Sequence, residues 1–154
     1  ENTDRFRLSV TEPISGRDRS FGLFRSPLEQ TFFHAVREVF PTYTPYPNVA
    51  LKSVVDADAL KPHLSGAERS FLYTGLVDCV LFDAQDDFRP VAFFELDSSH
   101  HDAPDRRERD AQKDRILALA GRRLYRIRPH DREVTRADLV CLLKQLPRPI
   151  PASD

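Results

Sequence analysis

Two strand-like segments that carry acidic side chains among apolar ones constrain this chain most. They run from Leu76 to Phe82 and from Val91 to Asp97, with a short turn-forming stretch from Asp83 to Pro90 between them. Segments in this arrangement pair as an antiparallel hairpin. Side chains alternate between the faces of a strand, so Glu95 and Asp97 share one face. The sequence therefore predicts a sheet that carries carboxylates among its apolar side chains.

These carboxylates predict a cation site. Burying a carboxylate among large apolar residues is costly unless another group compensates its charge, and a divalent cation is one such group. Asp78 of the first segment, with Glu95 and Asp97 of the second, forms a candidate set of oxygen ligands for a hard cation. The structural alternative is that one acid caps a loop and another pairs with an arginine.

A basic helix is expected directly after the hairpin, from Pro104 to Ala120, with Gly121 as the residue that ends it. Lys113 lies three residues after Asp110 and four before Leu117, which is the spacing of one helix face. Lys113 is therefore expected on the same side of the helix as an acid and an apolar anchor.

The remaining segments suggest a helix at each end of the domain. Ser26, Pro27 and Glu29 form a helix start, with a capping serine, a proline at the first position and a glutamate at the third, and the helix runs to Phe40. The other expected elements are an irregular edge strand from Thr42 to Leu51, a short helix from Val54 to His63 that is broken at Pro62, a helical turn from Ser65 to Tyr73, a strand from Leu124 to Arg128 and a last helix from Thr135 to Gln145.

The order of these motifs resembles the PD-(D/E)xK superfamily, which has the fold of the restriction endonucleases. Within it, the chain is most similar to an uncharacterised bacterial family close to the very-short-patch-repair endonucleases. The segments that carry the resemblance are Val77 to Leu81, Phe94 to His100, Arg109 to Asp114 and Ala120 to Ile127. The resemblance implies an α/β fold with a three-layer core of order αβββαβ, in which helices flank a central mixed sheet. Its domain would span residues 26–146, after an arm or hairpin at 1–25 and before a flexible tail at 147–154.

The resemblance also implies a metal-dependent nuclease that hydrolyses phosphodiester bonds in DNA. In the superfamily, acids at the positions of Asp78 and Glu95 hold Mg²⁺ or Mn²⁺, and the Leu96 carbonyl would be a backbone ligand. The metal activates water and stabilises charge on the phosphate. Asp97 departs from the pattern, because much of the superfamily has a lysine there. Either Lys113 supplies that charge from a different backbone position and Asp97 assists the metal, or the site has lost catalysis and kept binding.

Two further residues have a catalytic and a structural interpretation. Glu29 either reaches back to the Ser26 amide as a helix cap or touches the metal site through water, as a first-helix glutamate does in the superfamily. His100 either lies near the scissile phosphate as a proton donor or acceptor, or is a solvated turn residue. Glu29 and His100 are therefore candidate catalytic residues.

Arginines cluster after the hairpin, although the formal net charge of the 154 residues is only -1. That charge argues against a protein that coats DNA, but not against a local basic face. The face would bind phosphates in a salt-sensitive manner, or it is simply solvated. Its members are Arg106, Arg107, Arg109, Arg122, Arg123 and Arg126.

Composition sets the remaining expectations. Cys79 and Cys141 are the only cysteines and lie in no metal-binding pattern, which fits a reducing, cytoplasmic location. No apolar run is long enough to span a bilayer, so no membrane association is expected. The chain begins with Glu1, which is compatible with additional domains in a longer protein. The competing function is a catalytically inactive, nuclease-like module that binds nucleic acid. The feature that discriminates the two is whether Lys113 reaches Asp78 and Glu95.

Overall fold

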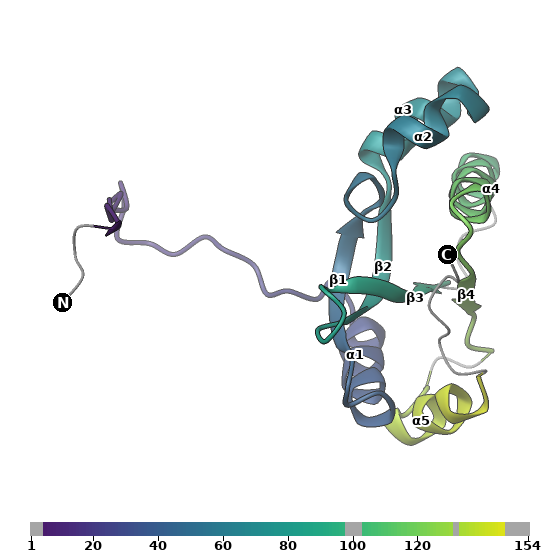
Figure 1. The fold of residues 1–154 in the computed structure, drawn as a ribbon. Helices are drawn as coiled ribbons and strands as arrows, with labels where there is room; N and C mark the ends of the chain where they lie inside the picture. The colour runs from purple at the N-terminus through teal and green to yellow at the C-terminus, as the bar shows by residue number, and fades with distance from the viewer. Residues whose placement is uncertain (1–4, 98–102, 131–132, 147–154) are drawn as a thin grey trace.

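A four-stranded sheet forms the centre of the protein, and the computed structural model describes residues 5–97, 103–130 and 133–146 (Figure 1). The strand order is β1-β2-β3-β4. The elements are α1 Pro27–Val39, β1 Thr44–Ala50, η2 Leu51–Ser53, α2 Ala57–Leu60, η3 Lys61–His63, α3 Gly66–Thr74, β2 Leu76–Asp83, β3 Arg89–Leu96, α4 Pro104–Leu119, β4 Leu124–Ile127 and α5 Arg136–Gln145.

The sheet is mixed, and its central hairpin is the one expected from the sequence. β2 pairs antiparallel with both β1 and β3, whereas β3 and β4 are parallel. A parallel pair needs a long crossover connection, and α4 provides it. The pairing register places Cys79 opposite Phe94, so the residues beside them, Asp78 and Glu95, lie next to each other across the two strands.

Helices cover both faces of the sheet, which makes three layers. On one face, α1 and α5 pack against Leu81 and Phe94. On the other, α3 and α4 pack against Val80 and Phe93. Figure 1 shows α1 and α5 together on one side of the sheet and α2, α3 and α4 on the other. Neighbouring residues of one strand enter opposite cores, as the alternation of a doubly covered strand requires. The predicted three-layer α/β class and the mixed sheet are confirmed.

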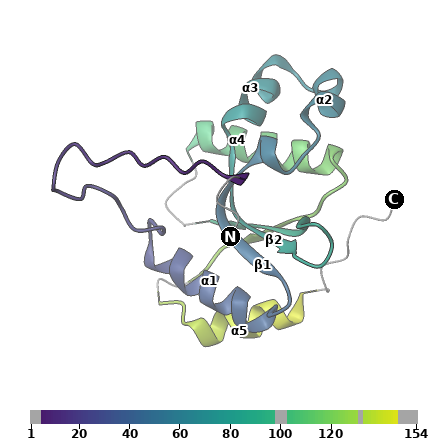
Figure 2. The ribbon, with the colours of Figure 1, turned by 60° about the vertical axis from the view of Figure 1, so that its left-hand side comes forward.

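The expected helix from Val54 to His63 differs most from the structure. That stretch instead contains the single turn α2, which begins at Asp56 because its carboxylate accepts a hydrogen bond from the Ala59 amide at 3.1 Å. The 3₁₀ turn η3 with Pro62 follows. Within the described residues, the segment from 6 to 25 forms neither helix nor strand and extends away from α1 (Figures 1 and 2). The predicted tail, residues 147–154, lies outside the described part of the chain. Among the described helices, none is both long and apolar enough to cross a membrane.

A reciprocal cap starts α3 and gives a direct test of local stability. The Ser65 hydroxyl accepts a hydrogen bond from the Glu68 amide at 3.2 Å, and the Glu68 carboxylate accepts one from the Ser65 amide at 2.8 Å. Ser65→Ala is expected to lower the free energy of unfolding by about 1 kcal/mol, measured by urea denaturation. The control is Ser70→Ala on the same helix, where the hydroxyl donates only to the Gly66 carbonyl. Equal losses in both variants would contradict a specific role of the cap.

Candidate active site

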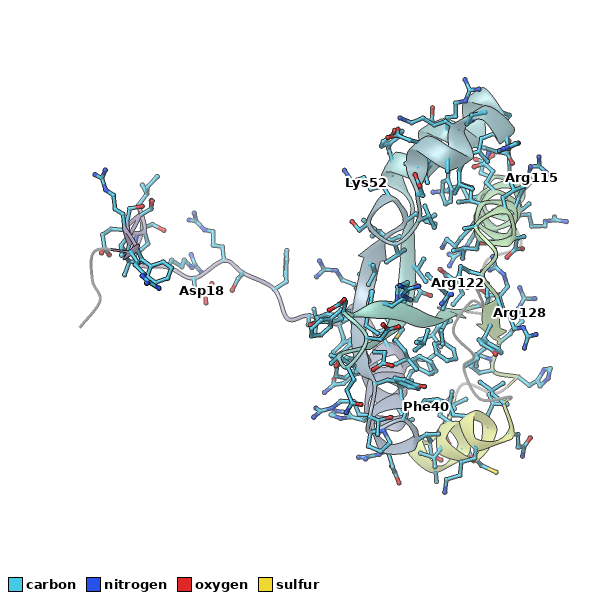
Figure 3. The ribbon with its side chains drawn as sticks, in the orientation of Figure 1. Asp18, Phe40, Lys52, Arg115, Arg122 and Arg128 are labelled. Atoms are coloured by element: carbon cyan, nitrogen blue, oxygen red, sulfur yellow. The ribbon has the colours of Figure 1, made fainter. Side chains whose placement is uncertain are left out.

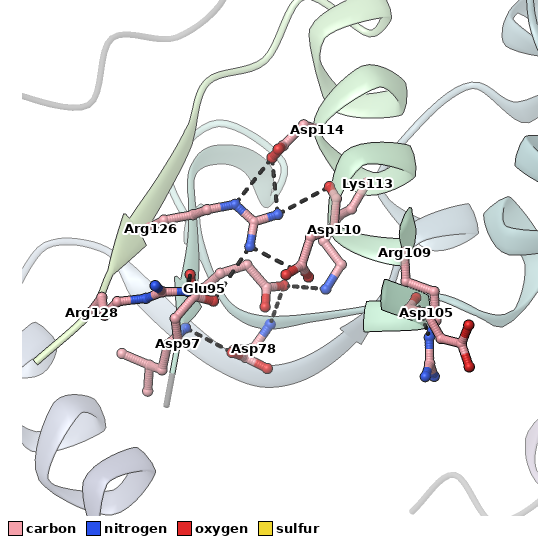
Figure 4. A network of polar contacts seen from close by, with 11 residues as sticks. Asp78, Glu95, Asp97, Asp105, Arg109, Asp110, Lys113, Asp114, Arg126 and Arg128 are labelled. Atoms are coloured by element: carbon pink, nitrogen blue, oxygen red, sulfur yellow. Dashed lines mark hydrogen bonds and ion pairs between the residues drawn. The ribbon is translucent and has the colours of Figure 1, made fainter. Parts of the chain in front are cut away.

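Asp78 and Glu95 meet at one end of the β2–β3 hairpin. The Asp78 amide donates to Glu95 Oε1 at 3.4 Å, and the Leu96 amide donates to Asp78 Oδ2 at 2.8 Å (Figure 4). Each strand therefore holds the carboxylate of the other through a backbone N–H. The structure brings the two predicted metal ligands together. For Leu96 it is the amide that contacts Asp78, and the role of the carbonyl as a metal ligand stays a prediction.

Lys113 joins this pair from α4. Its Nζ lies 2.5 Å from Glu95 Oε1. Both residues are nearly excluded from solvent, with 8% of Lys113 and 5% of Glu95 exposed. One turn further along α4, Ile116 and Leu117 are fully buried against the sheet. A lysine from a different backbone position thus reaches Glu95 of the acid pair, which is the placement that the first sequence alternative requires.

Burial dominates the electrostatics at Glu95. Burial raises the pKa of Glu95 to about 7, Lys113 opposes that rise, and the Asp78 carboxylate adds to it by repulsion. A carboxyl with a raised pKa keeps its proton at a pH where an exposed glutamate would be ionised. Burial therefore outweighs the Lys113 contact in setting the pKa of this carboxyl.

The donor set fits one kind of metal binding. The described residues contain no group of three or more His, Cys, Asp and Glu side chains placed to hold a metal ion. A closed protein cage for a metal is therefore not formed by the described side chains. Mg²⁺ is commonly bound by one or two carboxylates, with waters and substrate phosphates completing its shell. Asp78 and Glu95 suit that second arrangement.

Asp97 lies one residue beyond β3 and turns toward arginines. Its carboxylate lies 3.4 Å from Arg126 Nη1 and 4.0 Å from Arg128 Nη2. Arg126 also contacts Asp110 and Asp114 of α4 (Figure 4). A direct contribution of Asp97 to a metal shell stays a prediction, because its described side-chain contacts are with these guanidinium groups.

The proposed phosphate-binding arginines divide into two groups. Arg122 packs internally: it donates to the Pro90 carbonyl and lies over the Phe93 ring with 5.4 Å to its centroid (Figure 3). Arg126 is held by carboxylates. The other four project from α4 or the loop after it and are exposed, except for Arg106, which is half-buried. They are Arg106, Arg107, Arg109 and Arg123. This second group offers the more accessible positive charge.

Glu29 is used at the start of α1. Its carboxylate accepts from the Ser26 hydroxyl at 3.0 Å and from the Arg25 amide at 3.1 Å, while the Ser26 hydroxyl accepts from the Glu29 amide at 3.2 Å. The structure thus shows a capping role, with the amide of Arg25 in place of that of Ser26. A water-mediated contact of Glu29 with the metal site is not tested, and His100 lies outside the described residues.

The sequence interpretation gave Asp114 no role, although it lies on the helix face of Asp110 and Lys113. Its Oδ1 lies 3.0 Å from Arg126 Nη2 and 3.2 Å from Arg126 Nε. The available signal was its spacing, because residues four apart, such as Asp110 and Asp114, share a helix face. Lys113 lies between Asp110 and Asp114 in the sequence, so this turn of α4 carries two acids and one lysine.

One family model matches the chain. It carries the description "Protein of unknown function (DUF2726)" and matches residues 23–140, which include every described residue of the candidate site. No curated protein and no solved structure matches the chain. The match neither confirms nor excludes the resemblance to the PD-(D/E)xK superfamily.

Proposed function

We propose that this chain, which belongs to the DUF2726 family, is a metal-dependent nuclease that hydrolyses phosphodiester bonds in DNA. The observation that carries the proposal is the convergence of Asp78, Glu95 and Lys113 in one poorly exposed place. Two acids and a lysine from separate elements supply metal ligands and a cation for the same reaction centre. This is the set of charges that phosphodiester hydrolysis needs.

Asp78 and Glu95 would hold the divalent cation, Mg²⁺ or Mn²⁺. When bound, such a cation activates a water molecule and stabilises charge on the phosphate. Burial raises the pKa of Glu95 to about 7, and a bound divalent cation would favour the ionised carboxyl. Asp78 is oriented for the same purpose by the Leu96 amide.

Lys113 would stabilise the charge that develops on the phosphate oxygens. Its ammonium is fixed by Glu95 and largely shielded from water, and a preorganised charge in such a place interacts more strongly than one in solvent. The exposed arginines on the same helix, among them Arg107 and Arg109, would contact neighbouring phosphates of the DNA.

A second candidate function is a catalytically inactive module that binds nucleic acid. The observation in its favour is the ion pair itself, since Lys113 at 2.5 Å from Glu95 compensates the buried acid without any metal. In that case the acids are structural, and the arginines of α4 carry the binding.

A nuclease assay separates the two functions. The protein is incubated with Mg²⁺ or Mn²⁺ on single-stranded, duplex, nicked and mismatched DNA, with EDTA as the metal-free condition. Asp78→Asn is the matched variant, because the asparagine oxygen still accepts from the Leu96 amide while the negative charge is removed. We expect cleavage by the unmodified protein and only the metal-free rate from the variant. Binding of DNA without cleavage under every divalent cation would replace the nuclease by the binding module.

A further inference from the structure

An arginine on β4 is surrounded by acidic partners beside the candidate active site. Arg126 Nε and Nη2 donate to Asp114 Oδ1 at 3.2 and 3.0 Å. Nη2 also donates to the Asp110 carbonyl at 3.1 Å. Nη1 lies 3.5 Å from Asp110 Oδ1 and 3.4 Å from Asp97 Oδ1. All three nitrogens of the guanidinium thus have partners, and only 23% of the side chain is exposed.

These contacts join three elements at one point. Arg126 belongs to β4, Asp97 follows β3, and Asp110 and Asp114 lie on consecutive turns of α4. On α4, Lys113 lies between Asp110 and Asp114, the two acids that form ion pairs with Arg126 (Figure 4). The planar fork of arginine fixes direction as well as distance, which the point charge of a lysine does not.

The first half of α4 contains no fully buried residue. Ala103, the residue before the helix, provides no side-chain cap, and the buried residues of the helix are Lys113, Ile116 and Leu117. The sequence from Pro104 to Gln112 contains no large apolar residue that would anchor the first turns to the sheet. Ile116 and Leu117 anchor α4 one turn beyond Lys113, so on the other side the position of Lys113 relies on polar contacts, among them its own with Glu95 and those of Arg126.

We propose that Arg126 is a positioning residue, which holds the Lys113 turn of α4 against the sheet and so keeps the Lys113 ammonium on Glu95. Its catalytic meaning rests on the proposed nuclease function, whereas the placement of Lys113 does not. The proposal removes Arg126 from the expected DNA-binding face, because the acids of the protein occupy the guanidinium.

Amine labelling tests the placement without any catalysis. The chain has three other lysines, Lys52, Lys61 and Lys144, all more exposed than Lys113, so they serve as internal standards. An amine-reactive acylating reagent is applied to the folded protein, and the rate at each lysine is read by peptide mass spectrometry. In Arg126→Gln we expect Lys113 to react about tenfold faster, because the loss of the charge-assisted hydrogen bonds makes local opening of α4 easier. The rates at Lys52 and Lys61 should not change.

Two further variants make the result specific. Arg136→Gln removes an ion pair of 2.9 Å with Glu38 in the opposite layer, and it should leave the Lys113 rate unchanged. Asp114→Asn removes one partner of Arg126 and should raise the Lys113 rate by less than Arg126→Gln, with no further increase in the double variant. If Arg126→Gln does not fold, Asp114→Asn alone decides. An unchanged Lys113 rate in the folded variants overturns the proposal.

Cleavage kinetics give a second readout. A positioning role predicts that Arg126→Gln lowers kcat and leaves KM for DNA nearly constant. The reverse pattern, a higher KM with an unchanged kcat, overturns the proposal, since it identifies a phosphate contact. If the unmodified protein does not cleave DNA at all, faster labelling of Lys113 still supports the positioning role, and only the nuclease function fails.

Discussion

Lys113→Ala is expected to lower the rate of metal-dependent DNA cleavage by about 10² to 10³-fold, the usual effect of losing one electrostatic contact to a transition state. Affinity for DNA should hardly change, because Lys113 is 8% exposed and already in contact with Glu95. Single-turnover cleavage with excess protein gives the rate. Fluorescence anisotropy with labelled DNA in Ca²⁺ gives the affinity.

The matched control for Lys113→Ala is Arg109→Ala on the same helix. Arg109 is exposed, and its Nε donates only weakly to the Asp105 carbonyl at 3.4 Å. Its loss should weaken DNA binding and reduce the dependence of affinity on salt by about one counterion, with the cleavage rate at saturation unchanged. If Lys113→Ala behaves in this way instead, Lys113 is one more phosphate contact, and the binding module becomes the better description.

The hairpin and the meeting of Asp78 with Glu95 could be predicted because they follow from local rules. Alternation along two strands and a short connection fix which residues face each other. The side of α4 that carries Lys113 also follows from helix spacing. Its contact with Glu95 is a tertiary contact, which the sequence offered only as one of two alternatives.

The roles of Arg126 and Arg122 could not be read from the sequence. Arg126 contacts acids that lie 12 and 29 positions away in the chain, and Arg122 packs on the Phe93 ring. Alternation of basic and apolar residues shows that one side of a strand is polar, but not whether solvent, DNA or the protein faces it. The partners of Asp97 could not be read from the sequence either. Strand alternation does not fix the direction of its side chain, because β3 ends one residue before it.

The second large effect concerns Glu95. Glu95→Gln should abolish metal-dependent cleavage and also change how stability depends on pH. Burial raises the pKa of Glu95 in the folded protein from 4.5 to about 7, with Lys113 of α4 opposing the rise and Asp78 of β2 adding to it. Between these two pH values, the folded protein keeps a proton that the unfolded chain has already released. The free energy of unfolding of the unmodified protein must therefore fall as the pH rises through this range.

Glutamine does not titrate, so the variant lacks this contribution. Between pH 4.5 and pH 8, the unfolding free energy of Glu95→Gln should rise relative to that of the unmodified protein by about 3 kcal/mol. This value is the shift in the pKa of Glu95 converted to free energy. In the variant, the Lys113 ammonium faces a neutral amide at both pH values, so the variant adds no pH dependence of its own at this site. Urea denaturation in EDTA measures both proteins.

Glu38→Gln is the matched control, because Glu38 is exposed and pairs with Arg136 far from the site. Its stability curve should run parallel to that of the unmodified protein. At pH 8, added Mg²⁺ should stabilise the unmodified protein in proportion to site occupancy and leave Glu95→Gln unaffected, since only a cation that binds the folded state shifts unfolding. If the unfolding free energies of Glu95→Gln and the unmodified protein instead change with pH in parallel, the pKa of Glu95 is not raised in the folded protein. Equal stabilisation of both proteins by Mg²⁺ would show that this carboxylate is not a metal ligand.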